Sequence, residues 1–94
     1  MISMIEIIPG KLYKINTPLW FSKYPSKYSD AFGTGVLGAG VFIPKNEYLM
    51  CIRYDRHFNH TTKYHYETLV CMHYNKLLVI TRYINTLALC LNQV

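Results

Sequence analysis

The stretch Glu47-Tyr48-Leu49-Met50-Cys51-Ile52-Arg53-Tyr54 decides the fold, because its side chains alternate with a period of two. In an extended strand, successive side chains point to opposite faces. The alternation defines two faces, one with Tyr48, Met50, Ile52 and Tyr54 and the other with Leu49, Cys51 and Arg53. Both faces carry large apolar side chains, so we expect this strand to lie inside a sheet, with a neighbour on each side.

Further strands are expected before this stretch. Residues 10–15 read as a strand that opens after a turn, and residues 19–21 form a short apolar run. Residues 41–43 are a third candidate, joined to the deciding stretch by the turn Pro44-Lys45-Asn46. Between Ser22 and Gly40 the pattern dissolves into Pro, Ser and four Gly, which predicts a long early loop.

The second half of the chain predicts a hairpin and a last strand. Asn75-Lys76 separates the apolar runs 68–74 and 77–81, a spacing typical of a β-hairpin in which Asn75 takes a positive φ. Residues 83–85 are expected to form a short helical turn or bend, after which residues 86–91 resume the strand pattern. The polar stretch 55–66 is interpreted as a second connection.

Composition supports a mostly β fold. Nine Tyr, four Phe and one Trp suit a pleated, half-buried surface, whereas Ala, a common helix former, occurs only three times. We therefore predict that residues 1–94 form one small SH3-like β-barrel of five or six short strands with a long early loop. The chain shows neither a signal-peptide pattern nor a long apolar run, so we expect a cytoplasmic protein that does not enter a membrane.

The segment Gly10-Lys11-Leu12-Tyr13-Lys14-Ile15 resembles the opening strand of some small accessory proteins of tailed bacteriophages. The richness in Lys, Ile, Asn and Tyr also resembles that group, several of whose members have SH3-like folds. The resemblance implies a phage-encoded protein that acts in the host cytoplasm by binding a host protein and inhibiting or redirecting it.

The leading functional hypothesis is a non-enzymatic interaction protein that needs no cofactor. Tyr and Trp supply much contact area at low entropic cost and are enriched where binding energy concentrates. The early loop and the residues just before it are rich in aromatic and basic side chains. The predicted partner-binding residues are Trp20, Phe21, Lys23, Tyr24, Lys27, Tyr28 and Phe32. The partner is expected to be an acidic protein.

Nucleic-acid binding is the alternative. Ten Lys and Arg against five Asp and Glu give a net charge of +5, and neutralising phosphates with such cations releases counterions. Cations and aromatic rings interleave between Arg53 and Phe58, where rings can stack on bases. The residues assigned to this role are Arg53, Arg56, His57 and Lys63. A homodimer through the apolar residues Leu87, Leu89 and Leu91 is a further possibility.

Catalytic and metal-binding functions are not expected. Cys51, Cys71 and Cys90 lie in apolar surroundings, where a thiol is poorly nucleophilic, and no carboxylate pair stands at a suggestive spacing. His57, His60 and His65 lack a second ligand pair, so we predict no metal site and leave the role of these histidines open. The glycine-rich stretch 33–40 lacks the Gly-Lys-Ser/Thr ending of a phosphate-binding loop.

Overall fold

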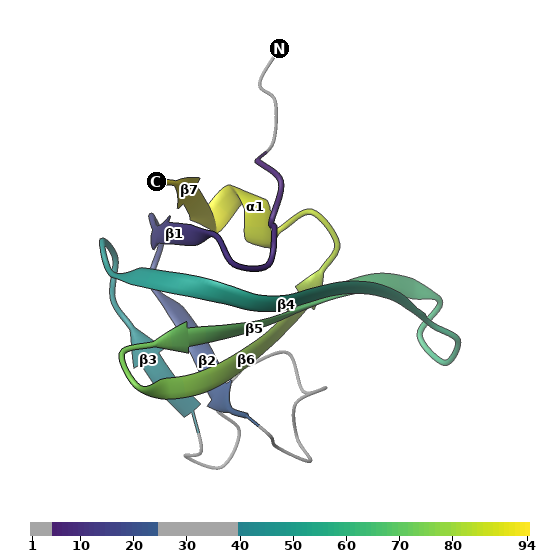
Figure 1. Cartoon of the computed structure of the whole chain (residues 1–94). Coiled ribbons are helices and arrows are strands. Elements are labelled where there is room, and N and C mark those ends of the chain that lie inside the picture. Colours follow the sequence, from purple (N-terminus) through teal and green to yellow (C-terminus); the bar gives the residue numbers. More distant parts are fainter. Residues whose placement is uncertain (1–4, 25–39) are drawn as a thin grey trace.

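The computed structural model describes residues 5–24 and 40–94, which form one curled antiparallel sheet (Figure 1). The order of strands across this sheet is β3-β2-β6-β5-β4-β1-β7. The elements are β1 (Leu12–Ile15), β2 (Leu19–Lys23), β3 (Gly40–Ile43), β4 (Tyr48–Asn59), β5 (Tyr64–His73), β6 (Lys76–Tyr83), α1 (Leu87–Cys90) and β7 (Leu91–Gln93).

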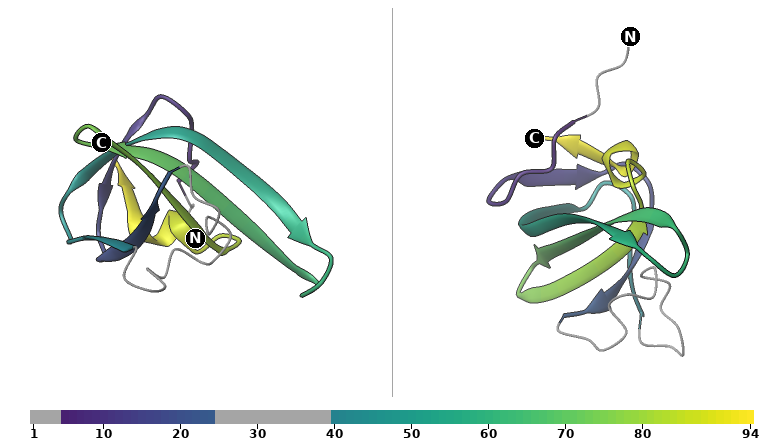
Figure 2. Two further views of the ribbon diagram at one scale, coloured as in Figure 1. Left: turned by 90° about the horizontal axis from the view of Figure 1, so that it is seen from below. Right: turned by 90° about the vertical axis from the view of Figure 1, so that its right-hand side faces the viewer.

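The sheet curls into a half-barrel around one core, as the two views of Figure 2 show. Alternate side chains point into this core in most strands, such as Tyr13 and Ile15 of β1 and Leu78 and Ile80 of β6. The largest fully buried side chains are Tyr13, Phe21, Ile15, Leu19, Ile43, Leu49, Leu69, Leu78, Ile80, Leu87, Leu91 and Glu67. The prediction of a small, mostly β domain is confirmed, but the described residues form seven strands rather than five or six.

The segment before β1 is attached to the core through Tyr13. Its hydroxyl accepts a hydrogen bond from the backbone N–H of Ile8 at 2.8 Å and donates one to the carbonyl oxygen of Glu6 at 2.7 Å. A buried phenol normally finds such partners, because an unpaired hydroxyl inside a protein costs free energy. The pairing brings Ile7 into the core.

A β-bulge in β4 changes which side chains of residues 47–54 share a face, compared with the prediction. The register with β5 shifts between Cys51 and Arg53, so that Cys51 pairs with Cys71 and Arg53 pairs with Val70. An extra residue in one strand reverses the side-chain alternation beyond it. Leu49 and Cys51 point inward, but beyond the bulge Tyr54 also packs against the core instead of sharing a face with Met50.

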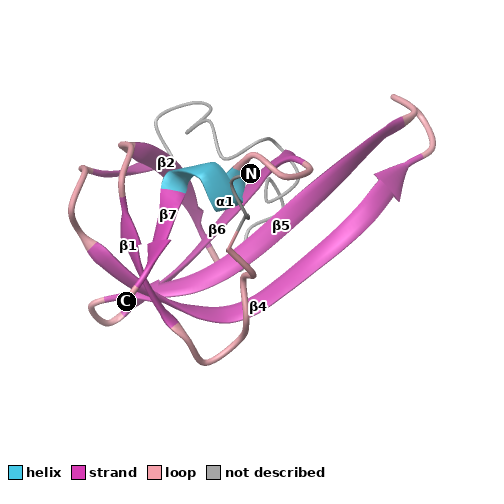
Figure 3. Cartoon of the chain, turned by 90° about the horizontal axis from the view of Figure 1, so that it is seen from above, coloured by secondary structure: helices cyan, strands magenta, loops and turns pink. Residues whose placement is uncertain are grey.

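The polar stretch 55–66 is mostly strand, and the expected connection is wrong. β4 and β5 continue to pair as far as Asn59 and Tyr64, and only the residues between them form a turn. The resulting ribbon projects from the half-barrel (Figure 3). We call the hairpin from Arg53 to Val70 the arm. Its outer part carries no buried apolar alternation, which is why the sequence pattern failed to indicate strand there.

The β5–β6 hairpin confirms the predicted pairing but not the predicted turn residue. His73 pairs with Lys76, so Tyr74 and Asn75 form the turn. The positive φ of 55° falls on Tyr74, and Asn75 is not among the described residues with positive φ. The β3–β4 turn follows the expected pattern more closely, because Asn46 has a φ of 76° and Asn tolerates this conformation.

The structure of the last residues, 83–93, also differs from the prediction. Of the predicted break at 83–85, Tyr83 still belongs to β6 and residues 84–85 form a turn, whereas the expected strand over 86–91 is the short helix α1 followed by β7. Leu87, Cys90 and Leu91 are buried while Leu89 is exposed, a helical rather than an alternating pattern. β7 pairs with β1, which gives the last strand a partner within the chain. None of the helices in the described residues has the length and apolarity needed to cross a bilayer.

Candidate functional site

Of the seven predicted partner-binding residues, the structure describes Trp20, Phe21, Lys23 and Tyr24. Phe21 is wrong as a contact residue, because its side chain is fully buried in the core. Trp20 is half exposed and packs against Phe42 of β3 with ring centroids 5.0 Å apart. Lys23 is exposed and Tyr24 is half-buried. The remaining assigned residues, Lys27, Tyr28 and Phe32, lie outside the described residues, as does nearly all of the glycine-rich stretch.

A continuous apolar strip, which the sequence did not single out, crosses the outer face of the half-barrel. Leu12 of β1 pairs with Met50 of β4, and Met50 pairs with Met72 of β5. Tyr48 and Tyr74 border the strip, and all five side chains line one hollow. We call these five residues the outer apolar surface. Leu12 is 41% exposed, Met50 43% and Tyr48 50%, so the surface is open to a partner.

The sequence pattern could not distinguish the outer apolar surface from the core. Leu12 and Met50 alternate with Tyr13, Leu49 and Cys51, and both sets are apolar. Which set faces inward depends on the direction of the curl, which is a tertiary property. An exposed apolar cluster of this kind marks an interaction site more often than an isolated exposed side chain does.

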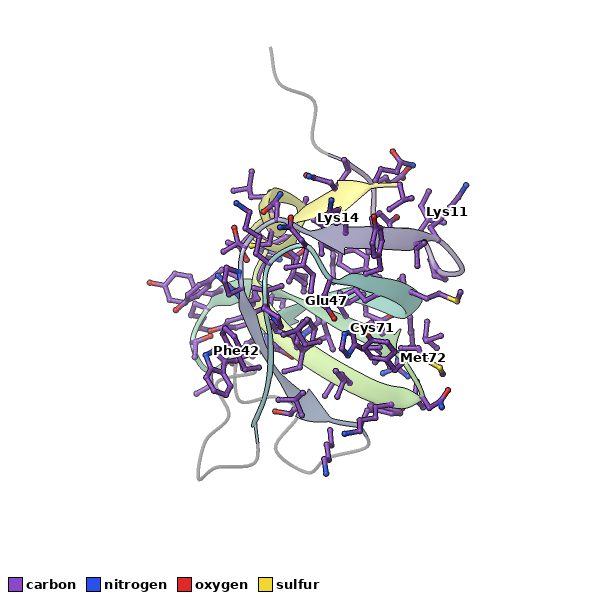
Figure 4. All side chains as sticks on the ribbon, turned by 90° about the vertical axis from the view of Figure 1, so that its left-hand side faces the viewer. Lys11, Lys14, Phe42, Glu47, Cys71 and Met72 are labelled. Carbon is purple, nitrogen blue, oxygen red and sulfur yellow. The ribbon has the colours of Figure 1, made fainter. Side chains whose placement is uncertain are left out.

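Polar and basic groups surround the outer apolar surface. Glu47 Oε1 lies 3.1 Å from His73 Nε2 and accepts a longer hydrogen bond of 3.5 Å from the Tyr74 hydroxyl. Lys14 Nζ lies 5.7 Å from the centre of the Tyr48 ring, within cation–π range. Figure 4 shows Lys11 and Met72 toward the same margin of the molecule and Phe42 toward the opposite margin. The Trp20–Phe42 pair is therefore a separate patch.

The four residues assigned to nucleic-acid binding all belong to the arm, but they do not gather at one point. Arg53 Nε lies 2.9 Å from Asp55 Oδ2, and its guanidinium carbon lies 5.9 Å from the Tyr24 ring centre. His57 Nε2 lies 3.1 Å from Thr68 Oγ1. Lys63 is exposed in the turn at the tip. The four groups are spread along one ribbon.

Arg56 belongs to a hydrogen-bond network that reaches the interior. Its Nε donates to the Tyr54 hydroxyl at 3.0 Å, and its Nη2 donates to Asn85 Oδ1 at 3.1 Å. The Tyr54 hydroxyl in turn donates to the buried carboxylate of Glu67. Burial, and then the hydrogen bond to Glu67, raise the pKa of Tyr54. The hydrogen bond to Tyr54 raises the pKa of Arg56, so this cation stays charged.

The cysteines have the properties of core residues. Cys51 and Cys71 are paired across β4 and β5, and both are free and fully buried. Burial raises the pKa of Cys51 to about 11 and that of Cys71 to about 12, far from the range of a reactive thiolate. His73, the histidine nearest in sequence to Cys71, has its Nε2 in contact with the Glu47 carboxylate. This environment does not activate either thiol as a nucleophile.

The histidines of the arm interact with aromatic rings. The Phe58 ring centre lies 5.0 Å from that of His60 and 4.9 Å from that of His65. Within residues 5–24 and 40–94, no three His, Cys, Asp or Glu side chains gather as a metal site would need.

No family model, curated protein or solved structure shows a significant match to this chain.

Proposed function

We propose that this chain is a non-enzymatic interaction protein and that it binds a partner protein through the outer apolar surface. The single observation that carries the proposal is the pairing of Leu12, Met50 and Met72 across three adjacent strands on the outer face. Apolar area removed from water stabilises a complex by about 25 cal/mol per Å². Met side chains also adapt to partners of different shape.

The charges around the outer apolar surface favour an acidic partner. Lys11 is exposed just before β1 and Lys76 at the start of β6, and Lys14 lies against Tyr48. Glu47 also lines the hollow, but its carboxylate contacts His73. The net charge of the whole chain is +5. Complementary charges accelerate association and exclude partners of the same sign. The expected partner surface therefore combines apolar side chains with Asp and Glu at its rim, and the bacteriophage resemblance favours a host protein.

The test compares two exposed apolar residues. Met50→Asp places a charge in the middle of the outer apolar surface, whereas the control Leu89→Asp changes α1, where Leu89 is 66% exposed. A tagged wild-type chain is used to capture a protein from the lysate of a candidate host, and the captured protein is then purified. We expect calorimetry to show at least about a ten-fold loss of affinity for Met50→Asp, because a hot-spot side chain contributes about 2 kcal/mol to binding. Leu89→Asp should bind with the affinity of the wild type.

Two results would oppose the proposal. Equal affinity of Met50→Asp and wild type would place the contact elsewhere. Size-exclusion chromatography that shows a dimer, converted to a monomer by Met50→Asp alone, would make the occupant a second copy of the chain. Leu87 and Leu91 no longer support the homodimer that the sequence suggested, because both side chains are buried in the core.

A further inference from the structure

We infer that the arm is a second binding site, separate from the outer apolar surface, and that its ligand is single-stranded nucleic acid. The inference sharpens the alternative that the sequence raised and does not depend on the proposed protein partner. The two sites lie at opposite ends of β4, since Met50 is near its beginning and Phe58 is near its end.

The arm presents its outer residues on a ribbon that no other described strand covers. β6 ends at Tyr83, opposite Tyr66, so the pairs beyond this point belong to β4 and β5 alone. Figures 1 and 3 show this ribbon extending from the half-barrel. A protruding two-stranded ribbon can contact a flexible strand of nucleic acid from more than one side.

Hydrogen bonds within the turn stabilise the tip of the arm. Asn59 Oδ1 accepts hydrogen bonds from the backbone N–H groups of Thr61 and Thr62, at 2.8 and 3.0 Å. The backbone N–H of Lys63 donates to the carbonyl oxygen of Asn59 at 2.8 Å, and Lys63 has a φ of 65°. This order lowers the entropic cost of binding, because the contact residues are already positioned.

Exposed aromatic rings occur along the arm and beside it. Phe58 is 39% exposed between His60 and His65, and it lines a pocket of about 390 Å³ together with His57, Asn59 and His60. Tyr64 is 57% exposed and meets the ring of Tyr83 edge to face, with centroids 5.7 Å apart. Exposed rings of this kind can stack on unpaired bases.

The charges of the arm favour a polyanion. Arg53 is paired with Asp55, and the second carboxylate of the arm, Glu67, is buried, so the exposed Arg56 and Lys63 are the cations that a polyanion would meet. Backbone phosphates would meet the cations while bases stack on the rings, which is the arrangement of single-strand binding proteins.

The experiment measures fluorescence anisotropy of labelled fifteen-nucleotide oligo(dT) and oligo(rU) with the full chain. If Arg56 and Lys63 each contact one phosphate, affinity should fall about seven-fold between 50 and 200 mM salt, from a slope of about 0.7 per phosphate. Phe58→Ala should weaken binding at least about five-fold, the loss expected from one stacked base. Lys63→Asn should weaken binding and reduce the salt slope, and Asn is chosen because it tolerates positive φ.

Matched controls lie at the other end of the molecule. Phe42→Ala removes a ring that is 47% exposed on β3, and Lys45→Asn removes a cation from the β3–β4 turn. Both controls should bind as the wild type does. The inference is overturned if no oligonucleotide binds at 50 mM salt, if the controls lose as much affinity as the arm variants, or if a duplex of the same length binds more tightly. A circular dichroism spectrum and a melting curve for each variant separate lost binding from lost folding.

Discussion

The carboxylate of Glu67 on β5 accepts a hydrogen bond of 2.7 Å from the backbone N–H of Leu87, the first residue of α1. Glu67 is fully buried, and its carboxylate also accepts the hydroxyl proton of Tyr54 and a longer hydrogen bond from Thr86. The Glu67 side chain thus connects Tyr54 at the base of the arm, Thr86 in the segment after β6, and Leu87 at the start of α1. Buried carboxylates need such partners, because an unpaired charge inside a protein is costly.

We predict that Glu67→Ala lowers the free energy of unfolding by about 3 kcal/mol, because it leaves the Leu87 N–H and the Tyr54 hydroxyl without their acceptor. Glu67→Gln keeps an acceptor oxygen and should cost less than half as much. Urea denaturation followed by circular dichroism measures both variants. Equal losses below about 1 kcal/mol would show that the network contributes little to stability.

The burial of the two leucines of α1, Leu87 and Leu89, distinguishes a helix from the strand that the sequence suggested. Leu87 is fully buried and Leu89 is 66% exposed. We predict that Leu87→Ala costs about 3 kcal/mol of stability, as a large-to-small change in a core does, and that Leu89→Ala costs less than about 0.5 kcal/mol. A strand would place both side chains on one face, so similar losses for the two variants in denaturant titrations would contradict the helix.

Neighbouring aromatic residues of β2 should respond in opposite ways to substitution. Phe21→Ala empties a fully buried position and should cost about 3–5 kcal/mol, enough to unfold a marginally stable domain. Trp20→Ala removes a half-exposed ring whose described aromatic partner is Phe42, and the domain should remain folded with a loss near 1 kcal/mol. Thermal melts compare the pair. A folded Phe21→Ala variant with a near-native melting temperature would refute this placement of β2.

Alkaline pH should destabilise the fold through its buried thiols. The pKa of Cys51 rises from 9.0 to about 11 and that of Cys71 from 9.0 to about 12 on burial. Between these values the unfolded chain loses protons that the folded chain retains, so stability is complete below pH 9 and falls as the pH rises toward 12. The melting temperature measured from pH 8 to pH 11 should decline, and the decline should be shallower in Cys71→Ala. An equally steep decline in that variant would assign the effect to other groups.

Some of this architecture could be predicted from local pattern. Residues 48–54 predicted a strand inside the sheet because each of their faces is apolar, and β4 does have β5 and β1 beside it. Pro44-Lys45-Asn46 predicted a turn, since Asn accepts the positive φ found at residue 46. The outer half of the arm could not be predicted in the same way. Its strands are stabilised by pairing with each other, and pairing leaves no hydrophobic period in a sequence exposed on both faces.

The candidate sites follow the same division. Arg53, Arg56, His57 and Lys63 were selected from the sequence because cations and aromatic side chains alternate there, and the structure shows that they share one ribbon. The outer apolar surface could not be selected, because Leu12, Met50 and Met72 are far apart in the chain and resemble core residues in type. Their exposure depends on which way the sheet curls.

By itself, the sequence determined that this chain forms a small β domain with apolar strands and a basic surface, because composition and a period of two are local properties. Only the tertiary structure decided which apolar face became the core, where β4 bulges, and that residues 87–90 coil into a helix beside Glu67. These outcomes depend on contacts between residues distant in sequence, such as Glu67 with Leu87, and a local pattern does not encode such contacts.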